Sequence, residues 1–311
     1  MQRFLPDEPN LNALKQEGHD LLEGVRSASP EALERVRRLG REPGRNFGLS
    51  DALKIVAREH GFESWQKLRQ HAEYLRSPEA AAERSVLRAA FEGGPRPEGL
   101  PHTLAVRCAL GDAEAVRNAL ARDRRAANRP CGALSLQPLA YLCFSRWADS
   151  DSARACASLL LEAGADPNAG RLWEWDPSCR LSVLYAAVGV RNDSELARML
   201  LDAGADPNDN ESLYHSVEHR DNVCTRLLLE RGARVEGTNA VCHMLDYDDP
   251  EGLELLLQAV GDLGKDPSHP LHHALERGRS PVVLAMLLRA GADPDAVRPS
   301  DGLTPLRLAV R

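Results

Sequence analysis

Two groups of histidines are the first residues in this sequence whose type and spacing could support chemistry. His215 and His219 lie four residues apart, and His269, His272 and His273 lie close together. On a helix, a spacing of four places both imidazoles on one face, as two ligands of a zinc site would be. No third ligand follows the first pair at an expected spacing. We therefore predict no metal at His215 and His219.

Three aspartates, Asp246, Asp248 and Asp249, form the next candidate site. They resemble a calcium loop only loosely, because Pro250 and Gly252 fall at the wrong places and no Glu stands at the twelfth position in frame. We predict a connection between two helices instead, with Asp249 capping the second. Glycine-rich phosphate loops, the GxSxG elbow and HExxH are absent from the sequence. We predict no catalytic residue and no cofactor.

Composition limits the remaining classes of function. The formal net charge of −7 disfavours nucleic acid as the main ligand. No stretch approaches the ~20 apolar residues of a membrane span, and the N-terminus lacks the apolar core of a signal peptide. Seven cysteines without a CxxC pair predict reduced core thiols in a cytoplasmic protein. A Cys–His nucleophile pair stays open as an alternative, but no pair is singled out.

A recurring helix end organises the sequence. Residues 159–168 read LLLEAGADPN, and near-copies stand at residues 199–208 and 286–295. The glycine of each copy suits the left-handed position after a helix, and the Asp-Pro that follows stops the helix. Such a recurring stop predicts stacked units rather than a single-core domain.

These closings, with openings such as TPLRLA at residues 304–309 and HPLHHA at residues 269–274, resemble the ankyrin repeat family over about residues 100–311. We count six units and the start of a seventh, of which units one, four and five are degenerate. The resemblance implies an all-α solenoid of helix pairs with short or degenerate β-hairpin fingers. It also implies that His272 bonds turn backbone rather than a metal.

Three irregularities interrupt the repeats. The closing glycines Gly164, Gly204 and Gly232 are separated by 40 and then 28 residues, against about 33 in the family. The long interval carries an extended finger, whereas in the short interval we expect the finger to be missing. Unit two has an insertion at residues 146–151, and the turn of unit five is rewritten at residues 260–262. Because the last unit stops within its first helix, we expect the natural protein to continue.

The sequence predicts three parts: a helical module at residues 1–78, a helix and Gly/Pro linker at residues 79–100, and repeats at residues 101–311. We expect four helices in the module, the third capped by Ser50 and the fourth by Ser64. Residues 57–68 resemble the N-terminal module that precedes ankyrin repeats in bacterial proteins, which supplies no catalytic residue. Arginines at residues 35–45 alternate with glutamates, so we expect a solvated helix face rather than a nucleic-acid site.

In the ankyrin family, partners meet the finger tips and the concave face of the first helices. Carried over to this sequence, that surface consists of the two positions before each inter-helix turn and the aromatic residues of the long finger. The candidate partner-binding residues are Phe144, Trp173, Trp175, Glu218, His219, Asp246, Tyr247, Glu276 and Arg277. We expect an excess of negative charge in the second half of the groove, which carries Glu218, Asp246 and Glu276.

The resemblance implies a non-enzymatic scaffold whose partner is another protein, with no role for a membrane and none expected for nucleic acid or a small-molecule ligand. Two alternatives remain open. One is a regulatory or inhibitory subunit, of the immunity or antitoxin type, that masks an enzyme. The other is an enzyme whose activity lies outside the repeats.

Overall fold

The computed structural model describes residues 3–38, 42–44, 46–176, 178–260, 263 and 269–310. The chain forms two compact units, one up to Arg180 and one from Leu181. The predicted all-α class is confirmed, since the described residues contain many short helices and one two-stranded sheet. Several residues used in the sequence interpretation lie outside the described part: Gly40, Arg41, Arg45, Gly261, Asp262 and Arg311.

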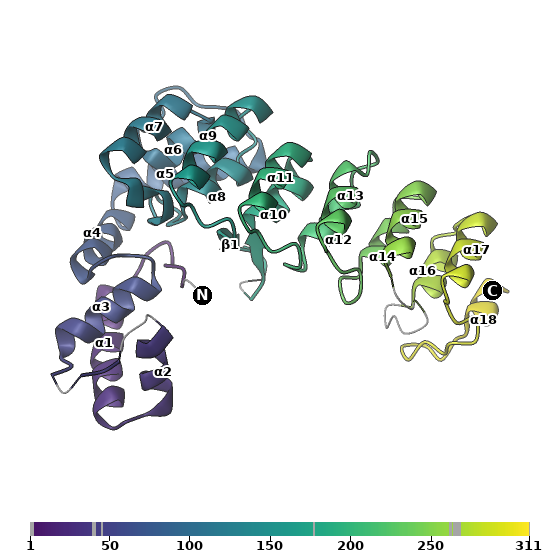
Figure 1. Cartoon of the computed structure of the whole chain (residues 1–311), viewed down its shortest axis with the longest axis horizontal. Helices are drawn as coiled ribbons and strands as arrows, with labels where there is room; N and C mark the ends of the chain where they lie inside the picture. The colour runs from purple at the N-terminus through teal and green to yellow at the C-terminus, as the bar shows by residue number, and fades with distance from the viewer. Residues whose placement is uncertain are drawn as a thin grey trace. The chain divides into compact units, whose positions relative to one another are not determined.

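The first unit begins with the four predicted helices (Figure 1). They are α1 (Leu11–Arg26), α2 (Pro30–Arg38), α3 (Leu49–Glu59) and α4 (Trp65–Leu75). Leu21, Val36 and Ile55 join the first three in one core. Ser64 caps α4, as predicted, by accepting the Lys67 amide at 3.3 Å.

The predicted cap of the third helix was wrong. Ser50 lies inside α3, and Gly48 is the capping residue, whose amide donates to the Asp51 carboxylate at 3.1 Å. Gly48 has no side chain that could accept a hydrogen bond from the helix. The side-chain bond at this cap therefore comes from Asp51, which accepts the Gly48 amide.

The remaining helices of this unit pair as helix hairpins. They are α5 (Pro78–Glu92), α6 (Leu104–Leu110), α7 (Ala113–Arg122), the 3-10 turn η1 (Arg124–Asn128), α8 (Pro138–Phe144) and α9 (Ser150–Glu162). The insertion of the second repeat lies against α5 and the Gly/Pro linker. There the Arg146 amide donates to Ala90 O and the Trp147 indole to Gly94 O, both at 2.8 Å.

The long finger is a hairpin of β1 (Gly170–Leu172) and β2 (Arg180–Ser182). The Trp173 amide donates to Cys179 O at 2.9 Å, which extends the pairing toward the tip. Both tryptophans are exposed, Trp173 by 43% and Trp175 by 86%. Neither tryptophan folds back to cover the loop.

The second unit repeats short first helices and longer second helices in a row (Figure 1). They are α10 (Val183–Tyr185) with the π-type turn η2 (Ala186–Val190), α11 (Ser194–Asp202), α12 (Ser212–Ser216), α13 (Val223–Glu230), α14 (Ala240–Met244), α15 (Pro250–Ala259), α16 (Pro270–Glu276), α17 (Pro281–Arg289) and α18 (Pro305–Ala309). The predicted left-handed stops are confirmed, with φ of 98° at Gly204 and 96° at Gly291. The Ala205 amide reaches back to Leu200 O at 2.9 Å and completes the helix stop.

Two further expectations are met in this unit. Within described residues 203–211 no strand forms, so the short interval lacks a finger. Asp209 fills it instead by accepting the Ser212 amide at 2.8 Å at the start of α12. Asp249 caps α15 through the Glu251 and Gly252 amides, each at 3.1 Å, as the helix-connection interpretation requires.

Candidate functional site

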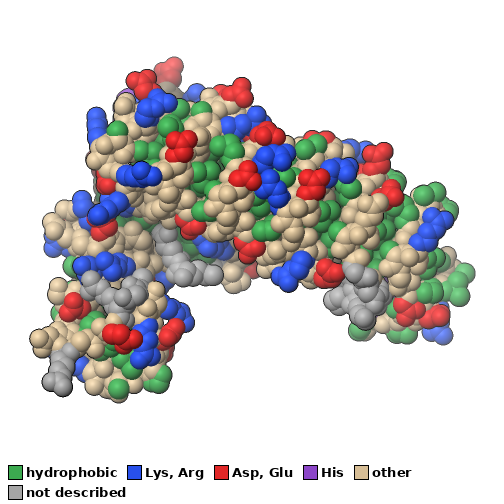
Figure 2. Space-filling view, in the orientation of Figure 1, with side chains coloured by type: hydrophobic (Ala, Val, Ile, Leu, Met, Phe, Trp, Pro, Cys, Tyr) green, Lys and Arg blue, Asp and Glu red, His purple; other side chains and the backbone are tan. Residues whose placement is uncertain are grey.

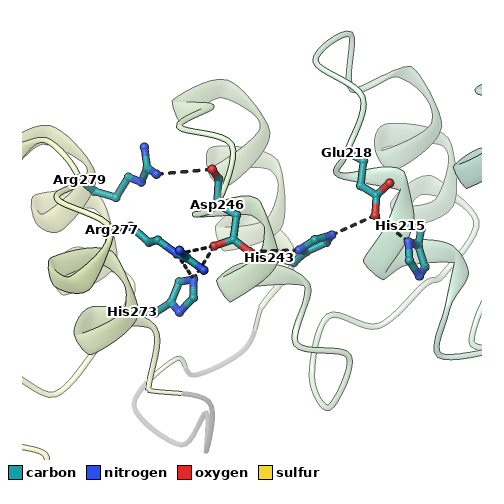
Figure 3. A network of polar contacts seen from close by, with 7 residues as sticks. All are labelled: His215, Glu218, His243, Asp246, His273, Arg277 and Arg279. Carbon is teal, nitrogen blue, oxygen red and sulfur yellow. Dashed lines mark hydrogen bonds and ion pairs between the residues drawn. The ribbon is translucent and has the colours of Figure 1, made fainter.

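A ladder of alternating histidines and carboxylates runs across the first helices of the second unit (Figure 3). His215 Nδ1 lies 2.7 Å from Glu218, and the same carboxylate lies 3.1 Å from His243 Nε2. His243 Nδ1 lies 3.3 Å from Asp246, which lies 2.9 Å from His273 Nε2. Each carboxylate thus pairs with the histidine three residues before it and with the histidine of the next repeat.

The local sequence explains this regularity. Each of α12, α14 and α16 contains a histidine that an acid follows three residues later, at residues 215/218, 243/246 and 273/276. A spacing of three puts both side chains on one face of the helix end. Stacking of α12 on α14, and of α14 on α16, then brings each acid to the following histidine. The last carboxylate, Glu276, pairs with Arg298 at 2.6 Å instead.

Tyrosine rings contact two histidines of the ladder, His215 and His243. Tyr214 stacks on His243 with ring centres 4.0 Å apart and planes within 3°. Tyr247 meets the same imidazole edge-on at 5.2 Å, and Tyr185 meets His215 edge-on at 4.9 Å. Such contacts restrict imidazole rotation, so the ladder presents fixed rings.

The carboxylates of the ladder are ionised. Burial disfavours the charge on Glu218, but hydrogen bonds from His243 and His215 outweigh it and lower its pKa. Burial likewise opposes ionisation of Asp246, whose pKa is lowered by hydrogen bonds from His273 and His243 and by the charge of Arg277. Burial raises the pKa of Tyr247, and the neighbouring carboxylates add to that effect. The Tyr247 hydroxyl therefore stays protonated beside these anions.

The structure brings together only part of the predicted surface. Glu218, Asp246, Tyr247 and Arg277 lie along the ladder, where Arg277 Nε is 2.7 Å from Asp246. His219 takes no part in it, because its Nε2 lies 2.9 Å from Gly189 O. The metal-type pairing of His215 with His219 therefore does not form.

Two other groups of predicted residues belong to the first unit. Phe144 is only 3% exposed, because its ring packs on Phe91 at 5.9 Å and under the Arg171 guanidinium at 5.1 Å. Its side chain offers a partner almost no surface. Trp173 and Trp175 remain on the exposed finger.

Sequence reasoning missed Tyr214, His215, His243 and His273 as members of the surface. The signal was present in the repeated spacing of histidine and acid, but the spacing was sought within one helix rather than across repeats. His272, by contrast, behaves as the resemblance implied. It is 1% exposed and its Nε2 lies 3.0 Å from Leu303 O.

One set of ladder atoms has the composition of a metal-ligand set. Among the described residues, one ligand atom each from His215, Glu218 and His243 lie within 4.8 Å of one another. Two imidazole nitrogens and one carboxylate oxygen are donors that zinc accepts.

On the face seen in Figure 2, acidic and basic side chains are interspersed, and neither sign dominates. None of the helices in the described part of the chain is both long and apolar enough to cross a bilayer.

Comparison with known proteins identifies one repeat and a shared fold. The ankyrin repeat family model matches residues 268–298. The human ASB11 ankyrin repeat domain is similar at 19% identity, covering 67% of this chain and 92% of that one, with a TM-score of 0.49. The ankyrin repeat domain of Bcl-3, a member of the IkappaB protein family, is similar at 22% identity, covering 68% of this chain and 95% of that one, with a TM-score of 0.51. No curated protein matches the chain. The matched segment is thus identified as an ankyrin repeat, and the repeated helix pairs with their left-handed stops share the fold of the Bcl-3 ankyrin repeat domain.

Proposed function

We propose that the chain is a non-enzymatic interaction module that binds a partner protein through the ladder face of α12, α14 and α16. Ankyrin repeats are generally protein–protein interaction modules, and solenoids of this kind use extended concave surfaces. The observation that carries the proposal is the ladder itself, in which fixed aromatic rings and partly exposed charges adjoin one another over three repeats.

The chemistry of the ladder face suits protein recognition. The Arg277 side chain is 52% exposed although Asp246 holds it, and Asp246 keeps 30% exposure. Tyrosine and arginine are enriched at binding hot spots. A side chain already held by a neighbour loses less freedom on binding, which favours affinity.

We do not propose that the partner recognises the negative charge predicted for this groove. Glu218 is shared by two histidines, Asp246 by His243, His273 and Arg277, and Glu276 is paired with Arg298. Each of these carboxylates is therefore already hydrogen-bonded or ion-paired within the protein. For that reason we do not propose an inhibitor of a basic enzyme as a second function.

The proposed location is the cytoplasm. None of the seven cysteines, all of them in the described part of the chain, forms a disulfide, and Cys108, Cys143, Cys156, Cys224 and Cys242 are buried. Buried cysteines without disulfides suit a reducing compartment.

The proposal is tested by capture of partners from the native cell extract with the full chain as bait. The Tyr247→Ala/Arg277→Ala variant should lose the captured protein, while its thermal unfolding stays within a few degrees of wild type, because both side chains are partly exposed. The matched control is Val282→Ala on α17, which removes a 63%-exposed side chain outside the ladder. Equal capture by all three baits would refute the ladder face as the binding surface.

The finger is tested separately with Trp173→Ala/Trp175→Ala. Its tryptophans are exposed aromatic side chains, so we propose that they contribute to the same capture. If this variant alone loses the partner, the finger rather than the ladder face is the binding surface.

A further inference from the structure

His215 and His243 each lie between two carboxylates. The inner carboxylate is Glu218, shared by both imidazoles, at 2.7 Å from His215 Nδ1 and 3.1 Å from His243 Nε2. The outer carboxylate is Glu211 for His215, 3.4 Å from its Nε2, and Asp246 for His243, 3.3 Å from its Nδ1. Every ring nitrogen of the two histidines thus faces an anionic oxygen.

That arrangement leaves a neutral histidine with one unfavourable contact. A neutral imidazole has one N–H and one lone pair, so it donates to only one of its two carboxylates. The other nitrogen then turns its lone pair toward a carboxylate oxygen. The mismatch occurs at both His215 and His243, and in each ring one of the facing carboxylates is Glu218.

A divalent cation at the inner position removes both mismatches. The inner nitrogens would face the cation with their lone pairs, and the outer N–H groups would donate to Glu211 and Asp246. Histidine ligands of metals almost always donate their second N–H to a carboxylate, carbonyl or water, which fixes the tautomer and raises ligand basicity. Here both outer carboxylates are already in place, and Asp246 is itself held by His273 and Arg277.

The dimensions fit a tetrahedral ion after small shifts. Bonds of about 2.0–2.2 Å in a tetrahedron place ligand atoms about 3.3–3.5 Å apart. The contact of Glu218 with His215 would open by about 0.6–0.8 Å and its contact with His243 by about 0.2–0.4 Å, while the nitrogens of the two histidines stay within the present 4.8 Å. The stacked Tyr214 and edge-on Tyr185 hold the imidazoles near these positions.

We propose that His215, Glu218 and His243 bind one divalent transition-metal ion of the zinc class on the ladder face. Two imidazoles and one carboxylate favour such an ion over Ca²⁺ or Mg²⁺, which prefer oxygen ligands. Three protein ligands leave the fourth tetrahedral position to water. The three side chains are 12–32% exposed, so the ion reaches the site from solvent. The site joins neighbouring repeats, because His215 and Glu218 come from one repeat and His243 from the next.

The test is calorimetric titration of the full chain with ZnCl₂ at neutral pH. Wild type should bind one high-affinity ion per chain. Glu218→Gln keeps the side-chain shape but replaces the carboxylate by a weaker ligand, and His243→Ala removes an imidazole ligand. Both should reduce zinc affinity by more than the ~10–100-fold expected when a residue that only hydrogen-bonds a ligand is changed. Asp246→Asn, which alters only the outer partner of His243, should fall within that range. His19→Ala removes an exposed histidine of α1 and should leave affinity unchanged.

Circular dichroism of each variant separates lost ligation from lost folding, and Glu218→Gln preserves side-chain size should His243→Ala unfold. Co²⁺ in place of Zn²⁺ should give visible bands of a tetrahedral ion without thiolate charge-transfer absorption, since no cysteine belongs to the site. The proposal is overturned if folded Glu218→Gln binds zinc as tightly as wild type, if wild type binds none, or if the cobalt spectrum shows thiolate ligands.

Discussion

Replacing Tyr141 by phenylalanine removes one hydroxyl that organises a whole turn. Tyr141 is fully buried in α8, and its Oη donates to Cys131 O at 2.7 Å. The same oxygen accepts the amides of Leu134 and Leu136, each at 3.3 Å. The hydroxyl therefore satisfies three backbone groups of the connection between η1 and α8.

The expected cost follows from those three groups. An unsatisfied buried backbone group costs about 1–3 kcal/mol. Cys131 O loses a short bond and the buried Leu136 amide a long one, whereas water can reach the Leu134 amide at its partly exposed position. We therefore expect Tyr141→Phe to lower the free energy of unfolding by ~2–4 kcal/mol.

The assay is urea unfolding followed by circular dichroism, with amide hydrogen exchange at Leu136 as a local readout. Stacked repeats can unfold in parts, so the local rate isolates the turn from the rest of the chain. Tyr247→Phe is the matched control, because the Tyr247 hydroxyl bonds no other residue in the described ranges. A Tyr141→Phe protein with wild-type midpoint and unchanged Leu136 exchange would refute the reasoning.

Two further predictions concern the same unit. Burial lowers the pKa of His71 from 6.5 to about 4. Between these pH values the unfolded chain binds a proton that the folded chain does not. The free energy of unfolding should therefore fall as the pH is lowered from 6.5 to about 4, by at most ~3 kcal/mol. His71→Gln should flatten this slope in urea unfolding at several pH values, and an unchanged slope would contradict the assignment. At Gly132 (φ +61°) an added Cβ would lie 2.4 Å from Ala105 Cβ, whereas at Gly164 (φ +89°) it meets nothing within 4 Å. Gly132→Ala should therefore lower the melting temperature clearly more than Gly164→Ala, which carries only the ~1 kcal/mol of backbone strain; equal losses would count against the clash.

The sequence predicted features that depend on local chemistry. The left-handed stops at Gly204 and Gly291, the caps at Ser64 and Asp249, and the missing finger before α12 all follow from short-range backbone preferences. Ser50 failed as a cap because glycine and an acid three residues on serve the same purpose.

Features that depend on contacts between repeats escaped prediction. The ladder needs His243 to meet Glu218 across 25 residues of sequence, and only stacking of α12 on α14 sets that register. Phe144 was placed on the surface by its position in the repeat, but Phe91 and Arg171 cover it from other elements. The boundaries at residues 78 and 100 remain a prediction.

Partner binding at the ladder face is tested most directly by amide hydrogen exchange of the full chain with and without its captured partner. The partner should slow exchange in residues 213–219, 242–247 and 273–277, which carry the ladder, and leave the second helices α13, α15 and α17 unchanged. Protection confined to those second helices, with the ladder segments exchanging as in the free protein, would show that the partner binds elsewhere.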